Sequence, residues 1–60
     1  MWLKTEKLLI DLSKIKEVQL SQKSIVFIYA DRNTVSITKN RPEAAQALFE
    51  HVAALLGAKE

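Results

Sequence analysis

Residues 25–38 have the sequence IVFIYADRNTVSIT, and this stretch decides the fold. The run 25–30 carries β-branched and aromatic residues on both faces, which favours a strand. The polar run 31–33 interrupts it, and Asn33 readily adopts the left-handed conformation that closes a three-residue hairpin loop. Alternation resumes over 34–39. This loop predicts that Phe27 lies opposite Ile37, although a one-residue slip would invert the last strand.

Toward the N-terminus the same alternation continues. It predicts two further strands over 3–12 and 15–21, with a bend at 13–14, and it lets the central strand begin at residue 24. A two-residue turn at 22–23 would place Leu20 opposite Ile25 and Val18 opposite Phe27.

Beyond residue 40 the apolar spacing changes from two residues to that of a helix, which we predict over 41–56. Asn40 is the expected N-cap, with Glu43 three residues later as in a capping box and Pro42 in the first turn. Gly57 follows where a C-terminal cap is needed. One apolar stripe runs along this helix: Ala45, Leu48, Phe49, Val52, Leu55 and Leu56.

These elements predict an α+β fold in one domain of residues 1–60. It consists of a four-stranded antiparallel β-meander with one C-terminal α-helix packed on one face, in the order ββββα. The helix stripe needs an apolar sheet face. On the predicted register that face carries Val18, Leu20, Ile25, Phe27, Tyr29, Val35 and Ile37, joined by Leu8, Ile10 and Leu12.

The composition limits the chemistry. The chain has 60 residues, no cysteine and one histidine, so disulfides, thiolate zinc sites and multi-histidine metal sites are excluded and no cofactor is expected. A core this small gains from oligomerisation. The longest apolar run covers residues 25–30, too short to cross a bilayer. We therefore expect a cytoplasmic protein with no membrane partner.

The back of the predicted sheet is the first candidate site. Val26, Ile28 and Ala30 lie there, with Leu9 nearby and polar residues around them. An apolar centre with a polar rim is typical of a dimer interface or partner site. Strand propensity alone explains the same residues equally well.

The outer side of the helix is the second candidate. It carries a seam of small residues interrupted by one histidine: Ala44, Ala47, His51, Ala54 and Ala58. Small side chains let a second helix approach closely. Alanine is also the best helix former and needs no partner, and His51 is then an ordinary solvent-facing residue.

The third candidate is a basic end. In a meander Lys23, Lys39 and Arg41 meet near the free N–H groups at the helix start, with Lys16 on the neighbouring strand. Cations beside a helix N-terminus attract phosphate groups. With a net charge of only +2, a solvated turn rich in lysine is the simpler interpretation.

The pattern contains no nucleophile, base and orienting group at plausible positions, so we do not expect an enzyme. The single tryptophan, Trp2, is interpreted as an anchor that packs the first strand on the core. Its alternative role is a contact for a partner.

Residues 10–56, IDLSKIKEVQLSQKSIVFIYADRNTVSITKNRPEAAQALFEHVAALL, resemble small uncharacterised bacterial and phage proteins with a β-meander and one terminal helix. The stretch also looks like the closing strands and capping helix of a pleckstrin-homology-like domain. A complete barrel of that kind has more strands than this chain has room for. The resemblance implies a binding or scaffold role and transfers no functional residue.

The sequence thus predicts a non-enzymatic interaction or scaffold module that acts as a homo-oligomer, a dimer as the first choice, through an exposed sheet face. A separate protein partner is the related possibility. The alternative is a small nucleic-acid-binding protein that contacts phosphates through its basic end.

Overall fold

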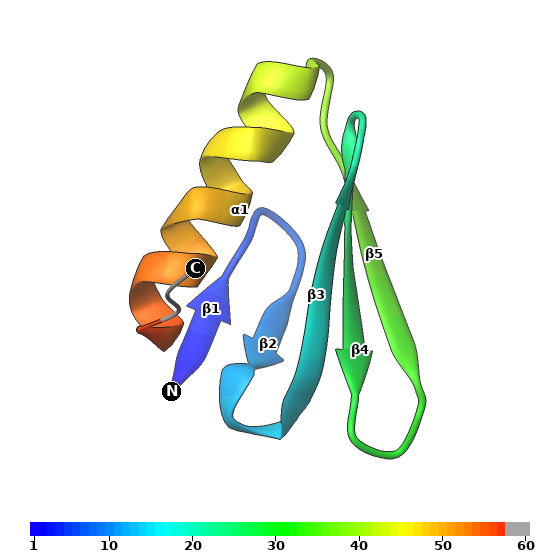
Figure 1. Cartoon of the computed structure of the whole chain (residues 1–60), viewed down its shortest axis with the longest axis vertical. Helices are drawn as coiled ribbons and strands as arrows, with labels where there is room; N and C mark the ends of the chain where they lie inside the picture. The colour runs from blue at the N-terminus through cyan, green and yellow to red at the C-terminus, as the bar shows by residue number, and fades with distance from the viewer. Residues whose placement is uncertain (58–60) are drawn as a thin grey trace.

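The computed structural model describes residues 1–57. In that part of the chain the elements are strands β1 (Trp2–Lys4), β2 (Leu9–Asp11), β3 (Ile15–Ser21), β4 (Ser24–Tyr29) and β5 (Thr34–Thr38), a single 3-10 turn η1 (Leu12–Lys14) and helix α1 (Pro42–Leu56) (Figure 1). The fold is α+β, as predicted. The sheet is not one four-stranded meander, because β1–β2 and β3–β4–β5 form two separate antiparallel sheets.

The first predicted strand, over 3–12, is instead a hairpin. Hydrogen bonds between Thr5 and Leu8 close its turn. The Thr5 N–H donates to the carbonyl oxygen of Leu8 over 2.8 Å. The N–H of Leu8 in turn donates to Oγ1 of Thr5 over 3.0 Å. Threonine hydroxyls often close turns in this way, and the polar residues between them keep the bend in solvent. The chain therefore reverses where unbroken alternation predicted an extended strand.

A second local motif separates the two sheets. The carboxylate of Asp11 accepts hydrogen bonds from the Ser13 hydroxyl (2.7 Å) and the Ser13 backbone N–H (3.1 Å), and η1 follows directly. The Leu12 N–H then donates to the Met1 carbonyl oxygen over 2.9 Å. The resulting turn redirects the chain, so that β2 does not continue into the ladder with β3.

The ladder between β3 and β4 has the predicted register, with Leu20 opposite Ile25 and Val18 opposite Phe27. Its turn contains a left-handed residue, Gln22, at φ 52°. A bulge near Lys16 at the start of β3 shifts the register between Ile15 and Glu17.

The ladder between β4 and β5 differs from the prediction by two residues: Phe27 lies opposite Val35, and Ile25 lies opposite Ile37. The loop has three residues, as predicted, but it lies one residue earlier, at 30–32, because the Tyr29 N–H donates to the Asn33 carbonyl oxygen over 2.8 Å. Arg32, at φ 76°, takes the left-handed position that was expected for Asn33. A shift of two residues leaves every side chain on its predicted face.

Helix α1 begins one residue later than predicted. Arg41 is the N-cap and makes no side-chain capping hydrogen bond, so the expected capping box of Asn40 and Glu43 is wrong. Pro42 occupies the first turn and Glu43 lies near the positive helix end, as expected. At the other end Gly57 caps the helix in the left-handed conformation.

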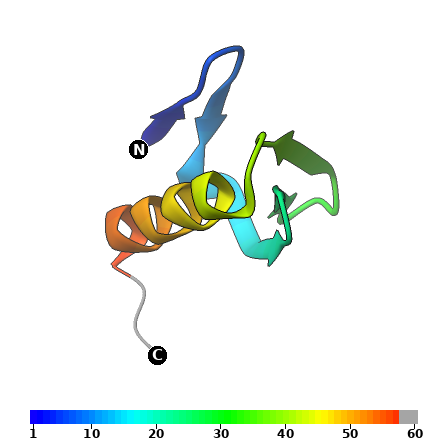
Figure 2. The same ribbon diagram turned by 90° about the horizontal axis from the view of Figure 1, so that it is seen from above.

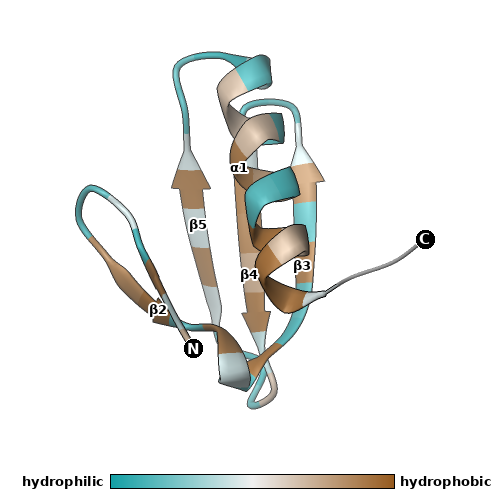
Figure 3. Cartoon of the chain, turned by 90° about the vertical axis from the view of Figure 1, so that its left-hand side faces the viewer, coloured by the Kyte–Doolittle hydropathy of each residue, from teal (hydrophilic) through white to brown (hydrophobic). Residues whose placement is uncertain are grey.

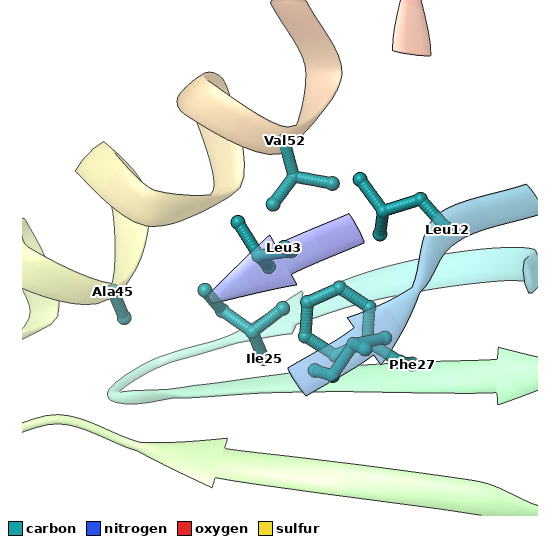
Figure 4. Packing of buried hydrophobic residues seen from close by; sticks show 7 residues of the cluster. Leu3, Leu12, Ile25, Phe27, Ala45 and Val52 are labelled. Carbon is teal, nitrogen blue, oxygen red and sulfur yellow. The ribbon is translucent and has the colours of Figure 1, made fainter. Parts of the chain in front are cut away.

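The core lies between the three-stranded sheet on one side and α1 with the β1–β2 hairpin on the other. Both cover the same face of β3–β4–β5 (Figures 1 and 2). Side chains from every layer meet there (Figure 4); the buried set is Leu3, Ile10, Leu12, Ile25, Phe27, Ala45 and Val52. Three residues assigned to this core remain substantially exposed: Leu8, Leu20 and Leu56.

Candidate interaction surfaces

The back face of the three-stranded sheet carries two of the predicted contact residues. Val26 and Ile28 are half-buried and alternate along β4. Neither α1 nor the hairpin covers this face (Figure 2). The flanking residues in the ladder are polar: Gln19 and Ser36 beside Val26, and Glu17 and Thr34 beside Ile28. The apolar area is therefore a narrow strip along the central strand.

The structure separates the other two residues of that predicted site. Ala30 lies in the β4–β5 turn, where its N–H donates to the Lys14 carbonyl oxygen over 3.1 Å. Leu9 is in β2, which belongs to the other sheet. It therefore cannot extend the Val26–Ile28 strip within one sheet.

A second apolar surface is the outer face of the β1–β2 hairpin. Its residues Trp2 and Leu9 were predicted separately as possible contacts, but not together on one surface. Leu3 and Ile10 face the core, so alternation directs Trp2, Lys4, Leu9 and Asp11 to the opposite side. Trp2 is 64% exposed and Leu9 is 66% exposed. Trp2 pairs with Asp11, and Leu9 lies two residues from Asp11 on the same strand, which makes Trp2 and Leu9 diagonal neighbours across the ladder.

The expectation that Trp2 anchors the first strand in the core is therefore wrong. The hairpin turn at Thr5 assigns the inward position to Leu3 and leaves Trp2 on the outer face. The residue pattern WLKTEKLLID contains this result, because a turn at residues 5–8 makes Leu3 and Ile10 partners. The turn that begins at Thr5 is the sequence signal from which this surface could have been predicted.

The helix seam is on the exposed side of α1, where Ala44, Ala47, His51 and Ala54 are all exposed. Ala58 lies outside the described residues. The predicted seam therefore exists as a surface of small side chains along the described helix.

The structure places three of the four residues of the predicted basic end at one end of the sheet. The Lys39 N–H donates to the Lys23 carbonyl oxygen over 2.8 Å, which joins the β3–β4 turn to the segment before α1. Arg41 follows at the helix N-cap. Lys16 does not join them. It lies near the start of β3, beside the bulge, whereas Lys23 follows the end of that strand.

Two open grooves run along the edges of the sheet. One, of about 300 Å³, separates the hairpin turn from β5 and is lined by residues 5–8 and 36–40. The other, of about 200 Å³, lies between the start of β3 and the end of α1, and its lining is mainly apolar. Neither encloses a cavity in which a small molecule would be surrounded.

Among the described residues, no three histidine or acidic side chains gather as a metal site would require, and no polar or charged residue is buried. The Ser13 hydroxyl is the main cause of the lowered pKa of Asp11, helped by the Ser13 backbone N–H, the N-terminal amine and Lys14 against a smaller effect of burial.

The described part of the chain contains no helix with the length and apolar character needed to span a bilayer. No family model, curated protein or solved structure matches the chain.

Proposed function

We propose that this chain is a non-enzymatic interaction module that self-associates through the outer face of the β1–β2 hairpin. The observation that carries the proposal is the exposure of Trp2 and Leu9, which are diagonal neighbours on that face. Tryptophan is strongly enriched among residues that dominate binding energy at interfaces. Covering these two side chains would remove more apolar surface from water than covering the half-buried Val26–Ile28 strip.

The charges on the hairpin face favour a second copy of the chain as the partner. Lys4 and Asp11 flank the two apolar residues, one with each sign. A two-fold contact between identical faces can therefore place Lys4 of each copy near Asp11 of the other. Opposite charges at the rim of an apolar contact fix its orientation and disfavour other partners.

The small core supplies a reason for self-association. Seven residues are buried among those described, and a single core of this size rarely contributes more than about 3–5 kcal/mol of stability. Apolar area buried between copies adds to that stability by mass action. Neither disulfides nor thiolate metal sites can serve instead, since the chain has no cysteine.

The test is the solution mass across a concentration series, measured by sedimentation. The double variant Trp2→Thr/Leu9→Thr keeps residues of good strand propensity and should lower the average mass. Leu20→Thr is the matched control, because it removes an exposed leucine from β3 and should leave the mass unchanged. A monomeric wild type contradicts the proposal. A mass lowered by Ile28→Glu but not by the double variant transfers the contact to the sheet's back.

A second candidate function is phosphate binding by the basic end, favoured by the hydrogen bond that joins Lys39 to Lys23 next to Arg41. Binding to a labelled DNA duplex would then weaken steeply with salt, and each lost phosphate contact would reduce the logarithmic slope by about 0.9. Alanine at these three positions should abolish binding, whereas Lys16→Ala, at the other end of β3, should not. Absence of binding at low salt eliminates this function.

A further inference from the structure

Strand β5 has an unpaired edge. In the ladder with β4, the Tyr29 N–H donates to the Asn33 carbonyl oxygen and the Lys39 N–H to the Lys23 carbonyl oxygen, both over 2.8 Å. Hydrogen-bonded and non-hydrogen-bonded pairs alternate along an antiparallel ladder, so the odd-numbered residues of β5 bond toward β4. The N–H and C=O groups of Thr34, Ser36 and Thr38 therefore point away from the sheet. No other described strand pairs with them.

We propose that β5 pairs antiparallel with β5 of a second copy, about a two-fold axis at Ser36, so that two three-stranded sheets become one continuous sheet. This register overlaps all five residues of the strand. Each outward N–H and C=O group meets its complement: Ser36 pairs with Ser36 of the second copy, and Thr34 pairs with Thr38. Threonine pairs directly opposite each other are favourable across strands.

The side chains on the core-facing side of β5 also match. In this register Val35 of each copy lies opposite Ile37 of the other, in a non-hydrogen-bonded pair where side chains approach closely. Ile37 lines the groove between β5 and the hairpin turn, together with Leu8, which is 41% exposed. The hairpin projects sideways past β5 (Figure 3). Val35 of the second copy would therefore enter that groove and cover Leu8 and Ile37.

The charges at the two ends of β5 are complementary in the same register. The turn before the strand carries Asp31, and the segment after it carries Lys39 and Arg41. Antiparallel pairing about Ser36 brings the end of each strand that follows Asp31 beside the end of the other strand that precedes Lys39 and Arg41. Arg32 lies in the same turn in the left-handed conformation, outside the extended register of the strand. This match of charge and register favours a second copy over an unrelated strand.

The β5 contact shares the self-association of the proposed function but uses different residues from the hairpin face, so the two contacts can fail separately. A copy that uses both contacts binds two different neighbours, and the assembly then exceeds a dimer. The Trp2→Thr/Leu9→Thr variant should in that case remain a dimer through β5. Adding Ser36→Pro, which removes an outward N–H and spares the β4 ladder, should reduce it to a monomer.

Cysteine cross-linking tests the register in the full chain, which has no cysteine of its own. The two Cα atoms of a hydrogen-bonded antiparallel pair lie about 5.5 Å apart, within the range of a disulfide. Ser36→Cys should therefore form a disulfide-linked dimer under mild oxidation at low protein concentration. Thr34→Cys alone should not form this disulfide, since residue 34 of the second copy lies opposite residue 38, several residues away along the strand. A mixture of Thr34→Cys and Thr38→Cys should cross-link to each other.

The outcomes separate the two contacts. Ser36→Cys that cross-links no faster than Thr34→Cys overturns the β5 contact, and it leaves the hairpin proposal standing if the wild type is still oligomeric. Rapid Ser36→Cys cross-linking that persists in the Trp2→Thr/Leu9→Thr background supports the β5 contact independently of the hairpin. Loss of cross-linking in that background shows that β5 does not pair by itself and overturns the proposal as stated.

Discussion

Leu3 lies opposite Ile10 in the β1–β2 ladder, and the two side chains are only 4% and 1% exposed. This one pair attaches the hairpin to the core. It also determines what the hairpin presents outside, because the residues that alternate with it, Trp2 and Leu9 among them, must face solvent. The stability of the hairpin and its exposed apolar face therefore have the same structural origin.

Shortening either partner of this pair should destabilise the protein. We expect Leu3→Ala or Ile10→Ala to lower the free energy of unfolding by about 2–5 kcal/mol, because each leaves a cavity in a small core. Leu9→Ala, on the exposed face of the same strand, should change it by no more than about 0.5 kcal/mol under conditions where the chain is monomeric. Urea denaturation measures both. Similar losses for Leu9→Ala and Ile10→Ala would contradict the assigned faces.

The left-handed residue Arg32 should respond to glycine. At φ 76° an ordinary side chain costs about 1–2 kcal/mol, and glycine removes that cost. Arg32→Gly should therefore raise the thermal midpoint, although part of the gain is lost to the greater freedom of the unfolded chain. Arg32→Val should lower it, since a branched Cβ fits this conformation least well. A valine variant as stable as the wild type would contradict the turn geometry.

At the helix cap, replacing Gly57 should have the opposite effect and destabilise the protein. A Cβ added there would meet no atom within 4 Å, so the cost of Gly57→Ala comes from φ +67° and not from crowding. We expect Gly57→Ala to lower the free energy of unfolding by about 1 kcal/mol and Gly57→Asn to lower it less, since asparagine tolerates this conformation. Chemical denaturation of the two variants compares them directly, and equal stability of Gly57→Ala and the wild type would argue against the cap.

The hydrogen bonds from Ser13 predict a pH dependence. They lower the pKa of Asp11, so the stability that they contribute is present above the unfolded-state pKa and is lost as pH falls through the folded-state pKa. Ser13→Ala should raise the pKa of Asp11, which a carboxyl NMR titration measures. The stability difference between the variant and the wild type should shrink in acid. A difference that is constant with pH would contradict this role.

Trp2 provides a direct optical readout of the hairpin contact, because it is the single tryptophan of the chain. Its emission should shift to shorter wavelength as protein concentration rises, since self-association through the hairpin face removes the indole from water. Lys4→Asp should weaken the shift by placing two like charges at the rim, and combining it with Asp11→Lys should restore it. Emission that is independent of concentration while the mass increases would place the contact elsewhere.

The sequence predicted the three-stranded part of the fold well because its signals are redundant there. The β-branched run over 25–30 and the turn at 22–23 agree on the β3–β4 register, and the helix stripe with Gly57 agrees on α1. The β4–β5 register was predicted two residues away from its actual pairing, because the three-residue loop lies one residue earlier than expected, where the Tyr29 N–H bonds to the Asn33 carbonyl oxygen. Alternation cannot detect such a shift.

The first twelve residues show the opposite case. The pattern over 3–12 is compatible with one long strand, and the hydrogen bonds at Thr5 and between Asp11 and Ser13 help to divide it into a hairpin and a turn. Secondary-structure propensity and apolar periodicity do not detect these short polar contacts, although the contacts decide which residues face the core. The exposure of Trp2, which carries the proposed function, follows from that local choice.

The order of the strands also has a consequence for how quickly the chain folds. Every ladder joins strands that are consecutive in sequence, so only short loops have to close before the hairpins form. Helix α1 follows the strands in sequence, and until it docks, Ile25 and Phe27 lack the cover that Ala45 and Val52 provide. We therefore expect rapid hairpin formation followed by helix docking. A nascent chain on the ribosome would expose its central strand until α1 has emerged.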